Sequence, residues 1–191
     1  MNIQCANCKY EFILPDERVP DASKFKLNCP KCREPILIER PDETAPMAAP
    51  ENFPHDAQVA FVYVESVTLQ NRINNFLKGK GFYVSEGRNI AESLEKLRIN
   101  YYNLLILEDS INAKLFQDLF KKWTGLRRRD VNVVFVNADC QSLHSGEAFY
   151  RGVNSVISKS DVESIEHLLE QAMSNYSGYL EPWSVAASRI Q

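Results

Sequence analysis

The sequence predicts an α/β protein in which a five-stranded parallel sheet follows a small β module that is held together by a metal ion. Two observations carry this prediction. From residue 58 onward, short apolar runs alternate with segments whose apolar residues recur at helical spacing. Before that point, four of the five cysteines occur as two C-x-x-C pairs within the first 32 residues.

The two cysteine pairs have the spacing of a tetrahedral zinc site. They are Cys5 with Cys8 and Cys29 with Cys32, which gives C-x2-C-x20-C-x2-C. Each tight turn aims two thiolates at one ion. Disulfides are the alternative, but a reducing compartment and a two-residue gap both disfavour them. We therefore expect one structural zinc ion per chain, and we expect the distant Cys140 to be a half-buried thiol outside this site.

Residues 1–40 are expected to fold as a zinc ribbon around that ion. Alternating residues predict strands at 9–14, 24–28 and 35–39. About forty residues bury too little apolar surface to fold alone, so the metal supplies folding energy. Four thiolates close the coordination sphere, which leaves no open position for a catalytic water.

The same segment resembles a short zinc-ribbon module found at the N-termini of many bacterial regulatory and membrane-associated proteins. The resemblance covers residues 2–39 and includes both C-x-x-C pairs. Its other matching positions are Ile3, Tyr10, Ile13, Leu14, Pro15, Asp16, Val19, Pro20 and Pro30.

A linker is predicted at residues 41–57, which contain four prolines, four acidic residues and no Lys or Arg. A proline-rich segment of this length extends up to about 50 Å. His55 lies within it and is expected to be a solvated residue rather than a metal ligand.

The domain predicted at residues 58–175 consists of five strand–helix units. Strands are expected at 59–64, 82–85, 103–107, 131–136 and 155–157, and helices from Leu69, from Asn89, and at 113–123, 142–150 and 161–173. A C-terminal tail, 176–191, follows and carries apolar residues at helical spacing. In such sheets the functional surface lies at the carboxyl ends of the strands.

Those strand ends carry Glu65, Glu108, Asp109, Asn137 and Lys159. With them, residues 58–175 resemble the receiver domain of bacterial response regulators, which has a flavodoxin-like fold. The resemblance implies a magnesium-binding acidic pair after the first strand, a phosphate-accepting aspartate after the third, a Thr or Ser after the fourth and a Lys after the fifth. The lysine matches, as Lys159, and Glu65 supplies one acid of the pair. Ser66 stands in place of the second acid, Glu108 in place of the acceptor, and Asn137 in place of the hydroxyl residue.

These departures predict a vestigial phosphorylation site. The loss of one acid of the pair disfavours magnesium binding, and the acceptor carboxylate is longer by one methylene. We expect Glu108 to pair with Lys159, either as a permanent substitute for the phosphate contact or as a plain salt bridge without a switching role. Asp109 is an alternative, displaced acceptor, although a slip of one residue along a strand reverses the direction of the side chain.

A second candidate site is the basic segment around Trp123. It comprises Lys121, Lys122, Arg127, Arg128 and Arg129. Such a run could contact phosphates or an acidic partner, but cations are also common as solvated residues at helix ends.

Composition excludes several classes of protein. The chain has 191 residues and a net charge of −3, so there is no general attraction to nucleic acid. No apolar run approaches the roughly 20 residues that span a bilayer, and the N-terminus lacks the pattern of a secretory signal. We expect a cytoplasmic, non-enzymatic bacterial signalling adaptor that binds protein partners. The alternatives are a phospho-accepting response regulator that uses Asp109 and a zinc-ribbon regulator that binds nucleic acid.

Overall fold

The structure, a computed structural model, describes residues 2–4, 8, 10–13, 24–39 and 50–188. The chain divides into two compact units, residues 1–46 and 47–191. Within the described ranges, no helix is long and apolar enough to cross a membrane.

The first unit contains two antiparallel strand pairs. Strand β1, Asn2–Gln4, pairs with β2, Glu11–Ile13, and β3, Lys24–Asn28, pairs with β4, Pro35–Glu39. The bounds of β3 and β4 are those predicted from the alternation of residues. Between them the chain turns at the second cysteine pair, where the backbone N–H of Arg33 donates to the carbonyl of Cys29 at 2.8 Å.

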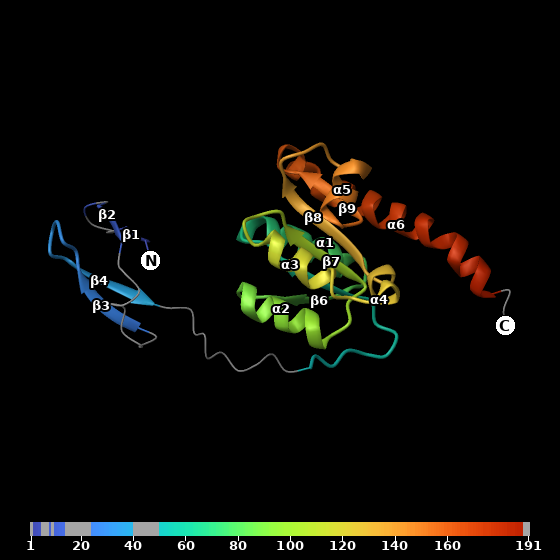
Figure 1. The fold of residues 1–191 in the computed structure, drawn as a ribbon, viewed down its shortest axis with the longest axis horizontal. Coiled ribbons are helices and arrows are strands. Elements are labelled where there is room, and N and C mark those ends of the chain that lie inside the picture. The colour runs from blue at the N-terminus through green and yellow to red at the C-terminus, as the bar shows by residue number, and fades with distance from the viewer. Residues whose placement is uncertain (1, 5–7, 9, 14–23, 40–49, 189–191) are drawn as a thin grey trace. The chain divides into compact units, whose positions relative to one another are not determined.

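The second unit is built on a five-stranded parallel sheet (Figure 1). Its strands lie in the order β6-β5-β7-β8-β9, which is the 2-1-3-4-5 order of flavodoxin-like folds. The strands are β5 (Val59–Tyr63), β6 (Tyr83–Glu86), β7 (Leu104–Glu108), β8 (Asn132–Ala138) and β9 (Ser155–Ser158).

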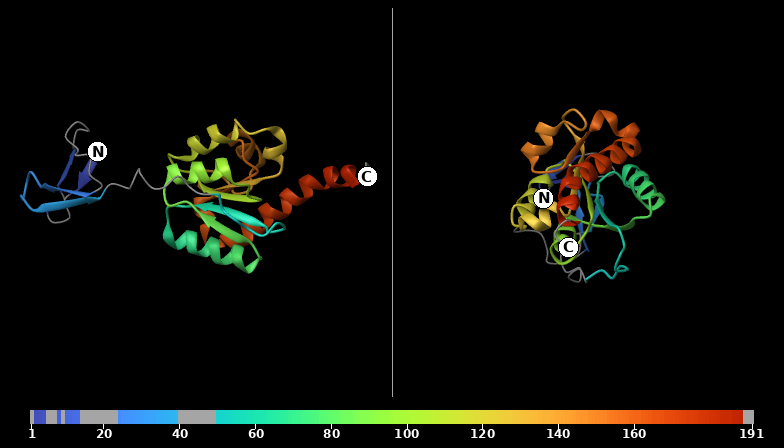
Figure 2. Two further views of the ribbon diagram at one scale, coloured as in Figure 1. Left: turned by 90° about the horizontal axis from the view of Figure 1, so that it is seen from below. Right: turned by 90° about the vertical axis from the view of Figure 1, so that its right-hand side faces the viewer.

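Helices cover both faces of this sheet, so its central strands are apolar on both sides (Figures 1 and 2). One face packs against α1 and α6, and the other packs against α2, α3 and α5. The helices are α1 (Val67–Gly79), α2 (Ile90–Ile99), α3 (Ala113–Phe120), α4 (Gly125–Arg129), α5 (Ser145–Arg151) and α6 (Ile165–Ser188), and the 3-10 helix η2 spans Lys159–Ser164.

Three helices differ from the prediction. The helix expected at 142–150 begins only at Ser145, after Leu143, which has a left-handed φ of 57°. The helix expected at 113–123 ends at Phe120, and a separate short helix, α4, begins after Thr124, whose hydroxyl accepts a hydrogen bond from the backbone N–H of Arg127 at 3.2 Å. The helix expected at 161–173 begins as η2 and continues as α6 to Ser188. The described part of the predicted tail is therefore the distal half of α6, which extends past the sheet (Figure 2).

Residues 50–57 also differ from the prediction, because they pack on the second unit instead of serving as a linker. The Glu51 carboxylate accepts hydrogen bonds from Tyr102 Oη and Ser85 Oγ, both at 2.7 Å, and lies 3.0 Å from Lys96 Nζ. Proline-rich composition predicts an extended backbone, but it does not reveal which side chains donate hydrogen bonds to the Glu51 carboxylate. Residues 40–49, the rest of the predicted linker, lie outside the described residues.

The contacts of Glu51 affect its protonation. Burial favours the neutral carboxyl, but the donors on Tyr102, Ser85 and Lys96 outweigh burial and hold the pKa of Glu51 below its ordinary value. The stability that these contacts contribute is therefore fully present above the ordinary glutamate pKa of about 4.3, and it is lost as the pH falls through the lower folded-state pKa.

Replacing Glu51 by Gln is expected to destabilise the second unit by about 1–3 kcal/mol at neutral pH, because buried donors lose a charged acceptor. The same substitution should flatten the acid limb of the stability curve. Urea unfolding followed by tryptophan fluorescence measures this, since Trp123 and Trp183 both belong to the second unit. The control is Asp56→Asn, whose carboxylate is fully exposed. Equal losses in the two variants would contradict the role of Glu51.

Candidate functional site

Three of the four predicted zinc ligands converge in the first unit. The sulfur atoms of Cys8, Cys29 and Cys32 all lie within 4.8 Å of one another, and the Cys8 and Cys29 sulfurs are 3.6 Å apart. Zn–S bonds of about 2.3 Å in a tetrahedron place the sulfurs about 3.8 Å apart. The thiols therefore fit a zinc ion. The fourth predicted ligand, Cys5, lies outside the described residues.

The second cysteine pair is held in a turn that suits a metal thiolate. The backbone N–H of Cys29 donates to the carbonyl of Glu34 at 2.9 Å, and Arg33 has a left-handed φ of 61°. The Cys32 backbone N–H, opposed by burial, lowers the pKa of the Cys29 thiol to about 6. Because the thiolate is the form that binds metal, this turn prepares Cys29 as a ligand.

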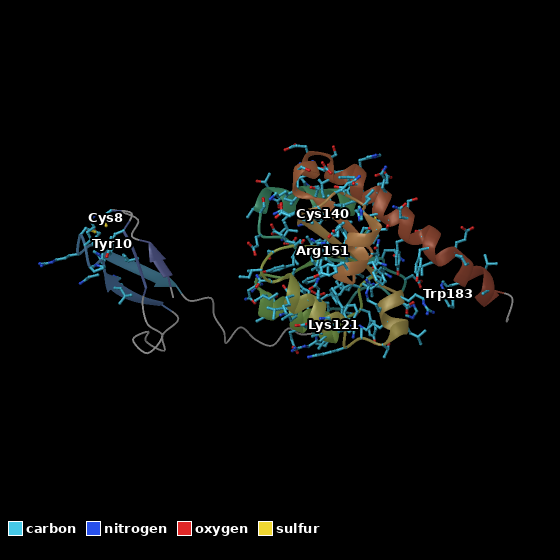
Figure 3. All side chains as sticks on the ribbon, turned by 45° about the horizontal axis from the view of Figure 1, so that its top comes forward. Cys8, Tyr10, Lys121, Cys140, Arg151 and Trp183 are labelled. Carbon is cyan, nitrogen blue, oxygen red and sulfur yellow. The ribbon has the colours of Figure 1, made fainter. Side chains whose placement is uncertain are left out.

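The remaining cysteine belongs to a different unit from the thiol cluster. Cys140 belongs to the second unit, and burial raises the pKa of its thiol (Figure 3). Its environment is that of a half-buried neutral thiol.

At the carboxyl edge of the parallel sheet, Glu108 is fully engaged by the protein. This side chain is only 6% exposed. One carboxylate oxygen accepts a hydrogen bond from the backbone N–H of Glu65 at 2.6 Å, and the other accepts one from Asn137 Nδ2 at 2.7 Å. We call these two contacts the Glu108 clamp. It joins the residues that follow β5 to the ends of β7 and β8.

A bulge in β8 places the amide of the clamp. The pairing of β8 with β9 shifts between Phe135 and Ala138, and Asn137 within this interval has a left-handed φ of 61°. Asparagine tolerates this backbone conformation far better than β-branched residues do. Bulges re-aim side chains, and this one accompanies the contact of Asn137 with Glu108.

The predicted pairing of Glu108 with Lys159 is wrong. Lys159 instead forms an ion pair with Asp139, and the two side chains are 59% and 78% exposed. Each carboxylate oxygen of Glu108 already accepts a hydrogen bond from an N–H group, so the buried carboxylate is satisfied without an ion pair to Lys159. An ion pair as exposed as that of Lys159 contributes about 0–1 kcal/mol.

The other residues of this edge have structural partners too. Asp109 accepts a hydrogen bond from Arg151 Nε at 3.1 Å, and Arg151 also pairs with Glu147 in α5 (Figure 3). The Ser66 hydroxyl caps α1, accepting from the backbone N–H of Leu69 at 3.4 Å. The carboxylate that the receiver resemblance implies after β5 is thus replaced by a helix cap.

Sequence reasoning missed two residues of this edge, Asp139 and Arg151. Asp139 directly follows the end of β8, so it could have been predicted from the rule that the ends of parallel strands meet at one edge. Arg151 lies on α5, and no local signal in the sequence connects it to Asp109.

The arginines of the predicted basic segment make contacts within the protein. Arg127 lies between the rings of Tyr101 and Trp123, with its guanidinium carbon 4.9 Å and 4.4 Å from their centroids. Arg128 donates to the carbonyl oxygens of Val131 and Gly152 and to Asn154 Oδ1.

Of the remaining bases, Arg129 is as buried as the other two arginines, and both lysines are exposed. Arg129 lies over the ring of Trp183, 4.0 Å from its centroid, and Lys121 pairs with Asp118 at 2.8 Å. Lys122 is exposed. The segment is therefore not a uniform solvated surface, because three of its cations lie against aromatic rings or protein oxygens.

Comparison with known protein families supports the prediction that the first unit is a zinc ribbon. A zinc-ribbon domain family matches residues 1–36. No curated protein matches the chain.

Several solved structures are similar in part. An orphan response regulator of H. pylori is 16% identical, with a TM-score of 0.48, over 62% of this chain and 98% of its own. A CheY-like receiver domain protein from Methanospirillum hungatei is 16% identical, with a TM-score of 0.47, over 64% of this chain and 98% of its own. A response regulator from Burkholderia multivorans is 12% identical, with a TM-score of 0.45, over 60% and 94%.

The fold assignment of the second unit follows from its own strand order. The chain consists of an N-terminal zinc-ribbon domain followed by a domain with the flavodoxin-like, receiver-like order 2-1-3-4-5.

Proposed function

We propose that this protein is a non-enzymatic signalling adaptor whose receiver-like domain binds protein partners without being phosphorylated. The observation that carries the proposal is the Glu108 clamp. Both oxygens at the acceptor position already accept hydrogen bonds from Glu65 and Asn137. Phosphoryl transfer needs a free carboxylate oxygen and a nearby magnesium ion, and the clamp competes with both.

In this proposal the clamp takes the place of a switch. A receiver changes its surface when a new phosphoryl group draws the surrounding loops together. Here a permanent carboxylate already joins the ends of β7 and β8 to the backbone after β5. The domain would therefore present one constant surface to its partners.

The runner-up function, phosphorylation of Asp109, has weaker support. The Asp109 carboxylate is paired with Arg151 and is only 18% exposed, so an incoming phosphodonor would have to displace the guanidinium. Nucleic-acid binding is also disfavoured, because Arg127 donates to the carbonyl oxygens of Leu97 and Asn100 and the chain has a net charge of −3.

The zinc ion completes the proposal as a structural element. One ion per chain would be held by Cys5, Cys8, Cys29 and Cys32, of which the last three converge in the described residues. Four thiolate ligands would give the ion a closed shell, so it would stabilise the ribbon rather than activate water.

Incubation with acetyl phosphate and magnesium is expected to leave the mass of the intact protein unchanged. Intact-mass spectrometry before and after incubation measures this, with a phospho-accepting receiver treated in parallel as the positive control. A stoichiometric adduct that disappears in Asp109→Asn would overturn the proposal and establish the runner-up. An adduct that persists in Asp109→Asn and disappears in Glu108→Gln would overturn it as well.

A further inference from the structure

A groove of about 560 Å³ opens at the amino-terminal ends of β8 and β9, away from the strand ends that carry Glu108. Helices α4, α5 and α6 supply its walls. Its lining includes Arg128, Arg129, Phe149, Tyr176 and Tyr179.

The groove carries positive charge without a counter-ion. Its lining contains two arginines and no Asp or Glu. Arg128 hydrogen-bonds only to neutral oxygens, and among the described residues no carboxylate lies within ion-pair distance of Arg128 or Arg129. Burial lowers the pKa of the Arg128 guanidinium, as expected for a cation that has lost water without gaining an anion.

The groove also presents large apolar side chains to solvent. Phe149 is 88% exposed and Tyr179 is 63% exposed, and both line the groove. Trp183, on the distal part of α6 (Figure 3), is 52% exposed, and Arg129 of the groove lies over its ring. An exposed aromatic cluster next to arginines has the composition of a protein-binding hot spot.

We propose that this groove binds an acidic peptide segment of a partner protein, with carboxylates facing Arg128 and Arg129 and an apolar side chain against Phe149 and Tyr179. The inference rests on the proposed adaptor function and names the surface and the partner chemistry. Charge complementarity selects this occupant, because the groove offers only cationic and neutral groups.

Two other occupants fit the groove less well. A second copy docked groove to groove about a two-fold axis would bring together two surfaces that carry arginines and no acidic residue, which is repulsive. Nucleic acid would need a longer array of phosphate contacts than two arginines provide, and the chain has a net charge of −3.

The test uses a displayed library of random peptides selected on the full-length chain. The enriched peptides should carry Asp or Glu together with an aromatic or aliphatic residue. Their affinity should fall about tenfold or more in Arg129→Glu and in Phe149→Ala, the loss expected for a hot-spot contact. The matched controls are Lys122→Glu, also a charge reversal, and Tyr150→Ala, an aromatic 86% exposed on the same helix; neither residue lines the groove.

Several results would overturn the inference. They are the absence of enriched peptides, enrichment without acidic residues, and equal losses in the test and control variants. Dimerisation in sedimentation equilibrium that Phe149→Ala abolishes would assign the groove to a second copy. Oligonucleotide binding that Arg129→Glu abolishes would assign it to nucleic acid.

The outcome for the groove is separable from that of the proposed function. If the selected peptides bind both groove variants with unchanged affinity, the groove is excluded as the binding site, but the adaptor proposal is unaffected. A phosphate adduct would overturn the phosphorylation-independent function while leaving a peptide-binding groove intact.

Discussion

Chelation of zinc is expected to unfold the N-terminal unit while the second unit keeps its fold. The strands of the first unit are three to five residues long, so they bury little apolar surface. A structural zinc ion contributes on the order of 10 kcal/mol to such a module. The second unit has its own core on both faces of a five-stranded sheet, and it does not depend on the metal.

Two signals separate the units in this experiment. Backbone amide NMR resonances of residues 24–39 should collapse toward random-coil positions after a chelator is added. Tryptophan fluorescence should stay unchanged, because both tryptophans belong to the second unit. Zinc content should fall in Cys32→Ser and remain at one ion per chain in Cys140→Ser. A single, global loss of structure on chelation would contradict the independence of the units, and metal analysis without zinc would contradict the site itself.

The parallel sheet and the ribbon strands at 24–28 and 35–39 were predictable because their signals are local, whereas the three-residue strand β1, Asn2–Gln4, was not predicted. Residues 104–107 form a continuous apolar run, which is what burial on both faces of a parallel sheet requires. Likewise, the strands at 24–28 and 35–39 follow from alternation on either side of a C-x-x-C turn. In each case a few consecutive residues contain the whole argument.

The partners of the polar residues were not predictable in the same way. The sequence places Glu108, Asn137 and Lys159 at one edge, but it does not show that a bulge turns Asn137 toward Glu108. Glu51 meets Tyr102, 51 residues away, and composition alone reads that segment as a linker. These contacts depend on backbone geometry and on pairing across the fold, which no short pattern encodes.

The distal part of α6 illustrates a third kind of limit. Pro182 favours ending a helix, yet α6 continues through it to Ser188. Tyr176 donates a hydrogen bond to the carbonyl of Arg129, and Arg129 lies over Trp183. Tertiary contacts on both sides of the proline thus offset its local preference, and the sequence pattern around residue 182 does not contain them.

Substituting Asn137 by Val is expected to destabilise the second unit by about 2–6 kcal/mol through two separable effects. The buried Glu108 carboxylate loses a donor, which costs about 1–3 kcal/mol. A β-branched residue must also adopt the φ of 61° that Asn137 has, which costs about 1–3 kcal/mol more. The second cost explains why Thr, the residue that the receiver resemblance implies here, is ill suited to this bulge.

The matched variant Asn137→Gly isolates the two effects. Glycine also removes the amide, but it adopts a positive φ without strain. The glycine variant should therefore lose only the stability that the missing donor costs, about 1–3 kcal/mol. Urea unfolding followed by tryptophan fluorescence measures both variants. Combining Asn137→Gly with Glu108→Gln should cost less than the sum of the single losses, because both remove the same hydrogen bond. If the valine and glycine variants are equally stable, the bulge is not strained as described; if the two single losses add fully, Asn137 and Glu108 are not coupled and the clamp does not hold the strand ends together.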